Sequence, residues 1–159
     1  MNHDKCLLLV DDNRNDLDLI RRIFESQKVG CPIVIIADGV EALDYLFCRG
    51  QYSERTSGNP VAVLLDLKMP RVDGFEVLQQ IKGDPKLKTI PVVIFTSSNQ
   101  SDDVGRCYEM GANAYVVKPV EYKELADRVK QIGLFWTLVN EPSPAVNANV
   151  EAEGAAATA

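Results

Sequence analysis

Five short apolar runs alternate along the chain with stretches whose apolar residues recur at helical spacing. The runs cover residues 5–10, 32–37, 61–67, 91–97 and 114–118. Most of them are too short and too rich in β-branched residues to be buried helices, so they predict strands. Because the runs are continuously apolar, helices should cover both faces of each strand. The pattern predicts an α/β fold with a doubly wound, five-stranded parallel sheet and five helices.

The stretches between the runs carry the spacing and the end signals of helices. Apolar residues recur every three or four positions at Leu17, Ile20 and Phe24 in the first stretch and at Phe75, Leu78 and Ile81 in the third. Asp38 and Ser101 are predicted N-caps, because a short polar side chain can accept a hydrogen bond from the first turn of a helix. Gly111 is predicted to end its helix in a left-handed conformation.

The last predicted helix runs from about Glu121 to Leu138. Its inward side should carry Leu125, Val129, Ile132 and Phe135. Gly133 is a weak point within it, by about 1 kcal/mol relative to alanine.

The chain divides into one domain and a tail. Residues 1–139 form the predicted domain, whereas residues 140–159 are alanine-rich, contain two prolines and have almost no large apolar side chains. Such a segment buries too little surface to offset the entropy lost on ordering, so we interpret it as a tail that could dock partly on a partner. Residues 48–60 form an unusually long loop, which is typical of a contact surface.

Composition and charge exclude several classes of protein. The 159 residues are 46% hydrophobic and 25% charged, as in one compact domain. The formal net charge of -6 disfavours binding to nucleic acid, which needs clustered Lys and Arg. The apolar runs are far shorter than the roughly 20 residues that cross a bilayer, and the start MNHDK is not a secretory leader. We therefore expect a cytoplasmic protein that binds neither membrane nor nucleic acid.

The cysteines and the single histidine do not form a recognisable metal motif. The four cysteines, Cys6, Cys31, Cys48 and Cys107, are widely scattered. Their spacing disfavours zinc, and small thiols in a reducing compartment are the simpler interpretation. His3 lies at the terminus, so any catalysis should use carboxylates, hydroxyls or lysine.

Polar residues end four of the five predicted strands. Asp11 and Asp12 follow the first strand, Asp66 ends the third, Thr96 ends the fourth and Lys118 ends the fifth. Each has a simpler explanation as a helix cap, a turn residue or a solvated charge. Parallel strands of a doubly wound sheet, however, place their carboxyl ends at one edge, where ligands bind. The coincidence of these residues predicts a functional site at that edge.

Electrostatics indicates what this site should bind. Two carboxylates about 4 Å apart repel by about 4 kcal/mol at an effective dielectric constant of 20, and here three converge. A divalent cation relieves the repulsion, and ligands that are all oxygen atoms favour Mg²⁺. A metal ion, an ammonium and a hydroxyl around a strand-end carboxylate are typical of phosphoryl transfer.

These motifs resemble the receiver domains of bacterial two-component response regulators. The resemblance runs from about residue 5 to residue 138 and rests on LLLVDDN, LLDLKMPRVDGFEVL, IFTSS and YVVKP. Family spacing is kept, since Thr96 follows Asp66 by 30 residues and Lys118 follows Thr96 by 22. The resemblance implies a flavodoxin-like sheet with the strand order 2-1-3-4-5.

The resemblance also implies a phosphorylation site and a metal site. Asp66 would accept a phosphoryl group from a histidine kinase. The protein would not be an enzyme in the usual sense, although it would catalyse its own phosphorylation and dephosphorylation. Asp12 and Asp66 would bind Mg²⁺ directly, Asp11 would bind it through water, and the main-chain carbonyl of Lys68 would complete the protein ligands. The residue type at Lys68 varies among receivers and affects the lifetime of the phosphoryl group, so that lifetime stays open.

Further roles follow from the same resemblance. Thr96 and Lys118 would hold the phosphoryl oxygens. Tyr115 would be the switch aromatic that turns inward as Thr96 moves, although it could instead be a half-buried strand residue. The peptide bond between Lys118 and Pro119 is commonly cis in such proteins.

Within the family, the chain is most similar to the stand-alone regulators of phytochrome-type histidine kinases. The long loop before the third strand and the ending FWTLVNEP carry this resemblance. Such regulators lack a DNA-binding output domain, so output should be a protein interaction. Tyr122, Phe135 and Trp136 could form a homodimer patch on the face of the fourth helix, fifth strand and fifth helix, or Phe135 and Trp136 could plug the base of the core.

Three alternatives remain open from the residues alone. A phosphatase with an aspartyl nucleophile normally has a second aspartate two positions later, where this chain has Lys68. A flavin or nucleotide binder would need Gly, Ser or Thr amides after the first strand, where this chain has Asp11, Asp12 and Asn13. A receiver could also signal mainly through binding in its unphosphorylated form.

Overall fold

The computed structural model describes residues 5–27, 31–56 and 58–147. His3, whose position argued against histidine chemistry, and residues 148–159 of the expected tail lie outside this part of the chain.

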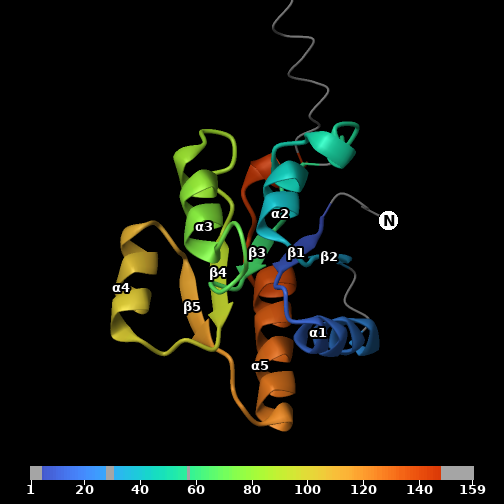
Figure 1. The fold of residues 1–159 in the computed structure, drawn as a ribbon. Coiled ribbons are helices and arrows are strands. Elements are labelled where there is room, and N and C mark those ends of the chain that lie inside the picture. Colours follow the sequence, from blue (N-terminus) through green and yellow to red (C-terminus); the bar gives the residue numbers. More distant parts are fainter. Residues whose placement is uncertain (1–4, 28–30, 57, 148–159) are drawn as a thin grey trace, which may run out of the picture.

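The core of the molecule is one parallel sheet (Figure 1). Its strands are β1 (Leu7–Val10), β2 (Ile33–Ile36), β3 (Ala62–Leu65), β4 (Val92–Thr96) and β5 (Ala114–Val117). They lie in the order β2-β1-β3-β4-β5, and every neighbouring pair is parallel. The predicted α/β class, strand number and strand order are confirmed.

Helices cover both faces of the sheet (Figure 1). They are α1 (Arg14–Ser26), α2 (Gly39–Leu46), α3 (Gly74–Gly83), α4 (Ser101–Glu109) and α5 (Tyr122–Leu134). Buried residues of α2, α3 and α4 pack in one hydrophobic cluster, and those of α1 and α5 pack in a second. The two clusters are separated by the sheet, as the continuously apolar strands predicted.

Strand β1 shows how the two clusters arise. Leu8 and Val10 point into the cluster of α2, α3 and α4, whereas Leu7 and Leu9 point into the cluster of α1 and α5. All four side chains are at most 1% exposed. Full burial of one such side chain stabilises the fold by about 1.5–3 kcal/mol. A strand with two buried faces is therefore apolar at every position.

The helix ends agree with the predictions at two of three positions. Asp38 caps α2, since its Oδ1 accepts a hydrogen bond of 3.0 Å from the backbone N–H of Glu41. Gly111 follows α4 with a φ of +100°. The prediction for Ser101 is wrong, because the chain enters the helix one residue earlier. Gln100 is the N-cap, with its carbonyl accepting from Val104 N–H, and Ser101 is already helical.

The end of the last helix also differs from the prediction. The α-helical hydrogen bonding stops at Leu134, and a π-helical turn, η2 (Phe135–Val139), follows. Extra residues in a π-turn change which side chains face inward. Phe135, predicted to face inward, is 46% exposed, whereas Trp136 packs against the cluster of α1 and α5. Gly133 permits close packing, since a Cβ there would lie 2.9 Å from Cζ of Phe24.

Residues 140–147, which the sequence analysis assigned to the tail, pack against the domain. The segment contains a single 3-10 turn, η3 (Pro144–Asn147). Val146 is only 2% exposed, and the carbonyl of Ala145 accepts a 3.2 Å hydrogen bond from Asn59 N–H. A buried apolar side chain and a backbone hydrogen bond thus join this polar segment to the domain.

The 48–60 loop is tied to α2. It contains a 3-10 turn, η1 (Gly50–Tyr52), and the Tyr52 hydroxyl donates a 2.6 Å hydrogen bond to Oε1 of Glu41. Arg55 lies 4.3 Å from the ring centroid of Tyr45, and its Nε donates to the carbonyl of that residue.

Within the described residues, no helix has both the length and the apolar character to cross a membrane.

Candidate functional site

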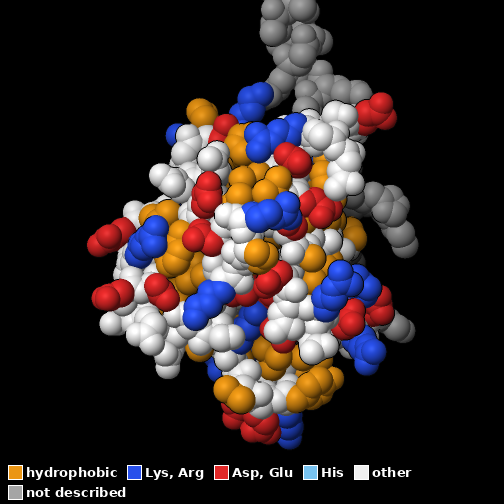
Figure 2. All heavy atoms as spheres, viewed as in Figure 1, with side chains coloured by type: hydrophobic (Ala, Val, Ile, Leu, Met, Phe, Trp, Pro, Cys, Tyr) orange, Lys and Arg blue, Asp and Glu red, His pale blue; other side chains and the backbone are white. Residues whose placement is uncertain are grey.

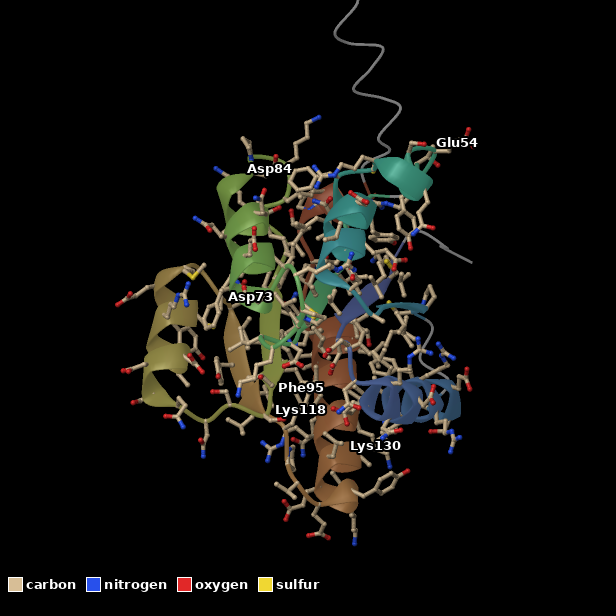
Figure 3. All side chains as sticks on the ribbon, in the orientation of Figure 1. Glu54, Asp73, Asp84, Phe95, Lys118 and Lys130 are labelled. Carbon is tan, nitrogen blue, oxygen red and sulfur yellow. The ribbon has the colours of Figure 1, made fainter. Side chains whose placement is uncertain are left out.

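The carboxyl edge of the sheet brings together the polar residues predicted from the strand ends. Strand pairing continues just past the strands, because Asp66 N–H donates to the carbonyl of Val10 at 3.0 Å and Lys118 N–H to that of Thr96 at 2.7 Å. Together with the pairing of β3 and β4, these bonds hold β1, β3, β4 and β5 side by side at this edge. Figure 3 labels Lys118 beside Phe95, whose ring centroid lies 5.7 Å from the Lys118 Nζ.

Three carboxylates form an acidic cluster at this edge. One ligand oxygen from each of Asp11, Asp12 and Asp66 lies within 4.8 Å of the others. Asp11 is 1% exposed and Asp66 8% exposed, whereas Asp12 is on the surface. The cluster is therefore reachable from solvent through Asp12 and closed on its inner side.

Hydrogen bonds to the backbone orient the two buried carboxylates. Oδ1 of Asp11 accepts from Asn13 N–H, and Oδ1 of Asp66 accepts from Leu67 N–H, both at 2.9 Å. The second oxygen of each carboxylate is left for the interior of the site. Gly74, the first residue of α3, allows the helix to approach closely, since a Cβ there would lie 2.2 Å from the main-chain oxygen of Asp66.

Lys118 supplies the ammonium of the site. Its Nζ lies 2.5 Å from Oδ2 of Asp11, 3.0 Å from Oδ2 of Asp16 and 3.7 Å from Oδ2 of Asp66. Burial lowers the pKa of Lys118, but the nearby carboxylates outweigh burial and raise that pKa above its ordinary value. Lys118 therefore stays charged at neutral pH.

The pKa of Asp11 shows that this single ammonium does not balance the cluster. Burial raises the pKa of Asp11 to about 6, Lys118 opposes this rise, and Asp66 adds to it. Three carboxylates converge in this cluster, and the ammonium of Lys118 contacts only Asp11 and Asp66 among them. The site carries an excess of negative charge.

The residues present fit a divalent metal ion. The donor set at the cluster consists of carboxylate oxygens, and histidine nitrogen and cysteine sulfur are absent from it. Hard cations such as Mg²⁺ and Mn²⁺ prefer such ligands, and a cation would relieve the excess charge. Lys68, the remaining predicted ligand, lies in the loop after Asp66 with an exposed side chain. The role of its main-chain carbonyl stays a prediction.

Thr96 and Tyr115 are linked through Ser98. Thr96 is 1% exposed, and its Oγ1 accepts a long, 3.5 Å hydrogen bond from Ser98 N–H. The hydroxyl of the half-buried Tyr115 donates to the carbonyl of Ser98 at 2.9 Å. The Ser98 hydroxyl in turn donates to Asp103 of α4 at 2.5 Å. The sequence did not predict a role for Ser98 or Asp103, because neither residue belongs to the pattern of polar residues at strand ends.

Two further findings concern the surroundings of the site. None of the peptide bonds in the described residues is cis, so the prediction of a cis bond between Lys118 and Pro119 is wrong; the trans form is the intrinsically preferred one.

A pocket of about 600 Å³ lies elsewhere, lined by Leu46, Asp84, Ala145 and neighbours, and it shares no residue with the acidic cluster.

The sequence matches a known protein family over most of its length. The response regulator receiver domain matches residues 7–130. This match covers most of the chain, including the acidic cluster, Thr96 and Lys118. The chain belongs to the response regulator receiver domain family.

Two curated relatives extend over most of the chain. The response regulator Rcp1 of Synechocystis sp. is 38% identical over 135 residues, which cover 85% of this chain and 90% of Rcp1. The probable methanogenesis regulatory protein FilR2 of Methanothrix harundinacea is 41% identical over 140 residues, which cover 87% of this chain and 88% of FilR2.

Solved structures show the same fold. The Mn²⁺-bound form of Rcp1 superposes with a TM-score of 0.82 at 37% identity, covering 87% of this chain and 99% of Rcp1. The phosphorylated cyanobacterial phytochrome response regulator RcpA superposes with a TM-score of 0.81 at 38% identity, covering 88% of this chain and 98% of RcpA. The bacteriophytochrome response regulator AtBRR superposes with a TM-score of 0.69 at 47% identity, covering 89% of this chain and 100% of AtBRR.

Proposed function

We propose that this protein is a response regulator that accepts a phosphoryl group on Asp66 from a histidine kinase. The observation that carries this proposal is the acidic cluster around Asp66 with the Lys118 ammonium 3.7 Å from its Oδ2. Asp66 directly follows the buried strand β3, so its carboxylate is held beside the groups that can stabilise a transferred phosphoryl group. The exchange would take place in the cytoplasm.

The proposed reaction is a direct transfer between two nucleophiles. A carboxylate oxygen of Asp66 attacks the phosphorus of the phosphohistidine of the kinase. The new O–P bond forms as the P–N bond breaks, and the electron pair of that bond remains on the imidazole nitrogen. Hydrolysis reverses the modification, when water attacks the acyl phosphate and the carboxylate leaves.

Other residues of the site would stabilise the transferred group. Lys118 would contact one phosphoryl oxygen, and the Thr96 hydroxyl would donate a hydrogen bond to another. Bound Mg²⁺, held by Asp11 through water, by Asp12 and Asp66 directly, and by the carbonyl of Lys68, would neutralise charge on the phosphoryl oxygens. Positioning and charge neutralisation account for most of the catalysis in such transfers.

The contacts around Ser98 support a switch that reads the phosphorylation of Asp66. When the Thr96 hydroxyl turns toward a phosphoryl oxygen, its long hydrogen bond from Ser98 N–H would break. Ser98 holds the hydroxyl of Tyr115 through its carbonyl, so a shift of Ser98 would release or reorient that ring. Thr96 and Tyr115 would in this way carry the signal from the site to the surface of β5 and α4.

A phytochrome-type histidine kinase is the proposed phosphoryl donor. The support is the similarity over nearly the full chain to RcpA, described as a phytochrome response regulator, and to the bacteriophytochrome regulator AtBRR. Incubation with such a kinase and radiolabelled ATP should label this protein within seconds to minutes. Labelling at the same slow rate as by an unrelated histidine kinase would count against this partner.

A homodimer through α4, β5 and α5 is the proposed output state. Five apolar residues on these elements and on the turn before α5 are exposed: Tyr108, Val117, Val120, Tyr122 and Leu134. Figure 2 shows hydrophobic atoms gathered at the lower end of the molecule, where α5 begins. Of the other patch residues expected from the sequence, Phe135 is exposed and Trp136 packs against the core. Light scattering after size exclusion should give twice the monomer mass on phosphorylation.

Intact-mass spectrometry tests the proposed phosphorylation. After incubation with acetyl phosphate and Mg²⁺, the wild-type protein should gain one phosphoryl group. The Asp66→Asn variant and a sample with EDTA should gain none. Asp18→Asn, which removes an exposed carboxylate of α1, is the control and should react as the wild type does. Addition that persists in Asp66→Asn would refute the assignment of the acceptor.

A further inference from the structure

Lys118 contacts a carboxylate that does not belong to the acidic cluster. Its Nζ donates a 3.0 Å hydrogen bond to Oδ2 of Asp16 in the first turn of α1. The side chain of Asp16 is 20% exposed and that of Lys118 is 6% exposed, so the pair is largely shielded from solvent. Figure 3 labels Lys118, which lies near the start of α1. Asp16 therefore interacts with the ammonium of the site from outside the site.

The local structure of the chain fixes Asp16 relative to the cluster. Oδ1 of Asn13 caps α1 by accepting from the N–H groups of Asn15 and Asp16, at 3.1 Å and 3.2 Å. Asn13 N–H in turn donates to Asp11. The backbone of Asp16 is thus tied through one residue to a buried carboxylate of the cluster. Such a position in the first turn also suits an acidic side chain, because the helix dipole is positive there.

The three carboxylates around Lys118 differ in what else they can bind. Asp11 and Asp66 belong to the set of oxygens that lie within 4.8 Å of one another, so a bound cation would reduce their attraction for the ammonium. Asp16 lies outside that set and would keep its full attraction. In a site loaded with a metal ion, Asp16 becomes the main competitor for Lys118.

We propose that Asp16 is a positioning residue that holds Lys118 on the α1 side of the site and competes with the phosphoryl oxygens for its ammonium. This inference rests on the proposed function, in which Lys118 contacts the group on Asp66. Before phosphorylation, Asp16 keeps the ammonium ordered on the α1 side of the site. When anionic oxygens arrive at Asp66, the hydrogen bond to Asp16 must weaken for Lys118 to reach them, and Asp16 thereby limits the stability of the phosphorylated form.

Binding of beryllofluoride, which mimics a phosphoryl group on a carboxylate, tests this competition at equilibrium. In the presence of Mg²⁺, titration followed by ¹⁹F NMR should show about three- to tenfold tighter binding to Asp16→Asn than to the wild type, the range expected for loss of a partly shielded ion pair. Asp18→Asn removes the same charge from an exposed position of the same helix and should change the affinity by less than about twofold. Asp16→Glu keeps the charge and should bind nearly as the wild type does.

A second comparison separates competition for Lys118 from a general effect of charge. In a Lys118→Met background, the added change Asp16→Asn should have no more effect than Asp18→Asn. The inference is overturned if Asp16→Asn binds no more tightly than Asp18→Asn, if it binds more weakly than the wild type, or if its advantage is the same with and without Lys118. A wild-type protein that binds no beryllofluoride and gains no phosphoryl group would instead contradict the proposed function itself.

Discussion

The two ends of the sheet differ in how their charged and polar groups are balanced. At the carboxyl end, oxygens of Asp11, Asp12 and Asp66 lie within 4.8 Å of one another, and the ammonium of Lys118 contacts two of these residues, Asp11 and Asp66. At the amino end, the 48–60 loop and residues 140–147 close the domain through paired groups, such as the hydrogen bond from Asn59 to Ala145. Excess negative charge is thus concentrated at the proposed phosphorylation site, whereas polar groups at the opposite end are paired.

The largest expected effect on stability comes from adding one methyl group at the carboxyl end of the sheet. In Gly74→Ala, the new Cβ would lie 2.2 Å from the oxygen of Asp66 and 2.7 Å from Cα of Leu67. Because the obstacles are backbone atoms, we expect the free energy of unfolding in urea to fall by about 3 kcal/mol or more. The variant should also be phosphorylated more slowly.

Gly105→Ala is the matched control for this substitution. Gly105 lies in the middle of α4, and a Cβ there would meet no heavy atom within 4 Å. We expect this variant to gain about 0.5–1 kcal/mol, because alanine loses less conformational entropy than glycine on folding. Equal effects of the two substitutions would contradict the close approach of α3 to Asp66.

The next largest effect is expected at the amino end of the sheet, where a substitution should lower stability without changing the rate of phosphorylation. Val146→Asp would place a carboxylate where the side chain is 2% exposed, so the segment should detach from the core. We expect a loss of about 2 kcal/mol of unfolding free energy, the value of one buried valine, with an unchanged rate of phosphorylation. Val139→Asp, at a 69% exposed position, should change the stability by less than about 0.5 kcal/mol. A slowed reaction in Val146→Asp would show that the two ends are coupled.

Mg²⁺ should stabilise the protein only while the acidic cluster is intact. At a concentration tenfold above its dissociation constant, a ligand that binds the native state adds about 1.4 kcal/mol to the free energy of unfolding. Thermal unfolding should therefore shift upward with Mg²⁺ in the wild type and in Asp18→Asn, and the shift should shrink or vanish in Asp66→Asn. A full shift in that variant would place the cation elsewhere.

The smallest expected effect concerns the 48–60 loop. Tyr52→Phe removes the hydroxyl that donates to Glu41, and we expect a loss of about 1 kcal/mol. Burial and the neighbouring Glu41 raise the pKa of Tyr52 to about 12, which agrees with a hydroxyl that remains protonated as a donor. Tyr108→Phe, at a 51% exposed position, is the control and should be nearly neutral. Equal stability of the two variants would remove the loop contact as a source of stability.

Much of the fold and of the site could be predicted, because both follow from repeated local patterns. A strand such as Leu7–Val10 is apolar at each position only if both of its faces are covered, which favours a parallel sheet. Parallel strands share a carboxyl edge, so Asp66 and Lys118 could be placed together from their positions at strand ends alone.

The features that could not be predicted depend on three-dimensional packing. Asp16 contacts Lys118 because the first turn of α1 lies beside the end of β5 in the folded chain. The sequence did offer one signal for this contact, namely an acidic residue in the first turn of the helix that follows an acidic strand end. Val146 is a single apolar residue in a polar segment, so no periodicity marked it as buried. The π-turn after Leu134 moved Phe135 out of the predicted inward face, since helical periodicity assumes an unbroken α-helix.

Chemical trapping of the phosphorylated residue tests the central claim most directly. Borohydride reduces an aspartyl phosphate to homoserine, and peptide mass spectrometry then locates the modified position. After phosphorylation with Mg²⁺ present, we expect homoserine at position 66 alone. Homoserine at position 11 or 12, or at position 66 to the same extent with EDTA present, would contradict it.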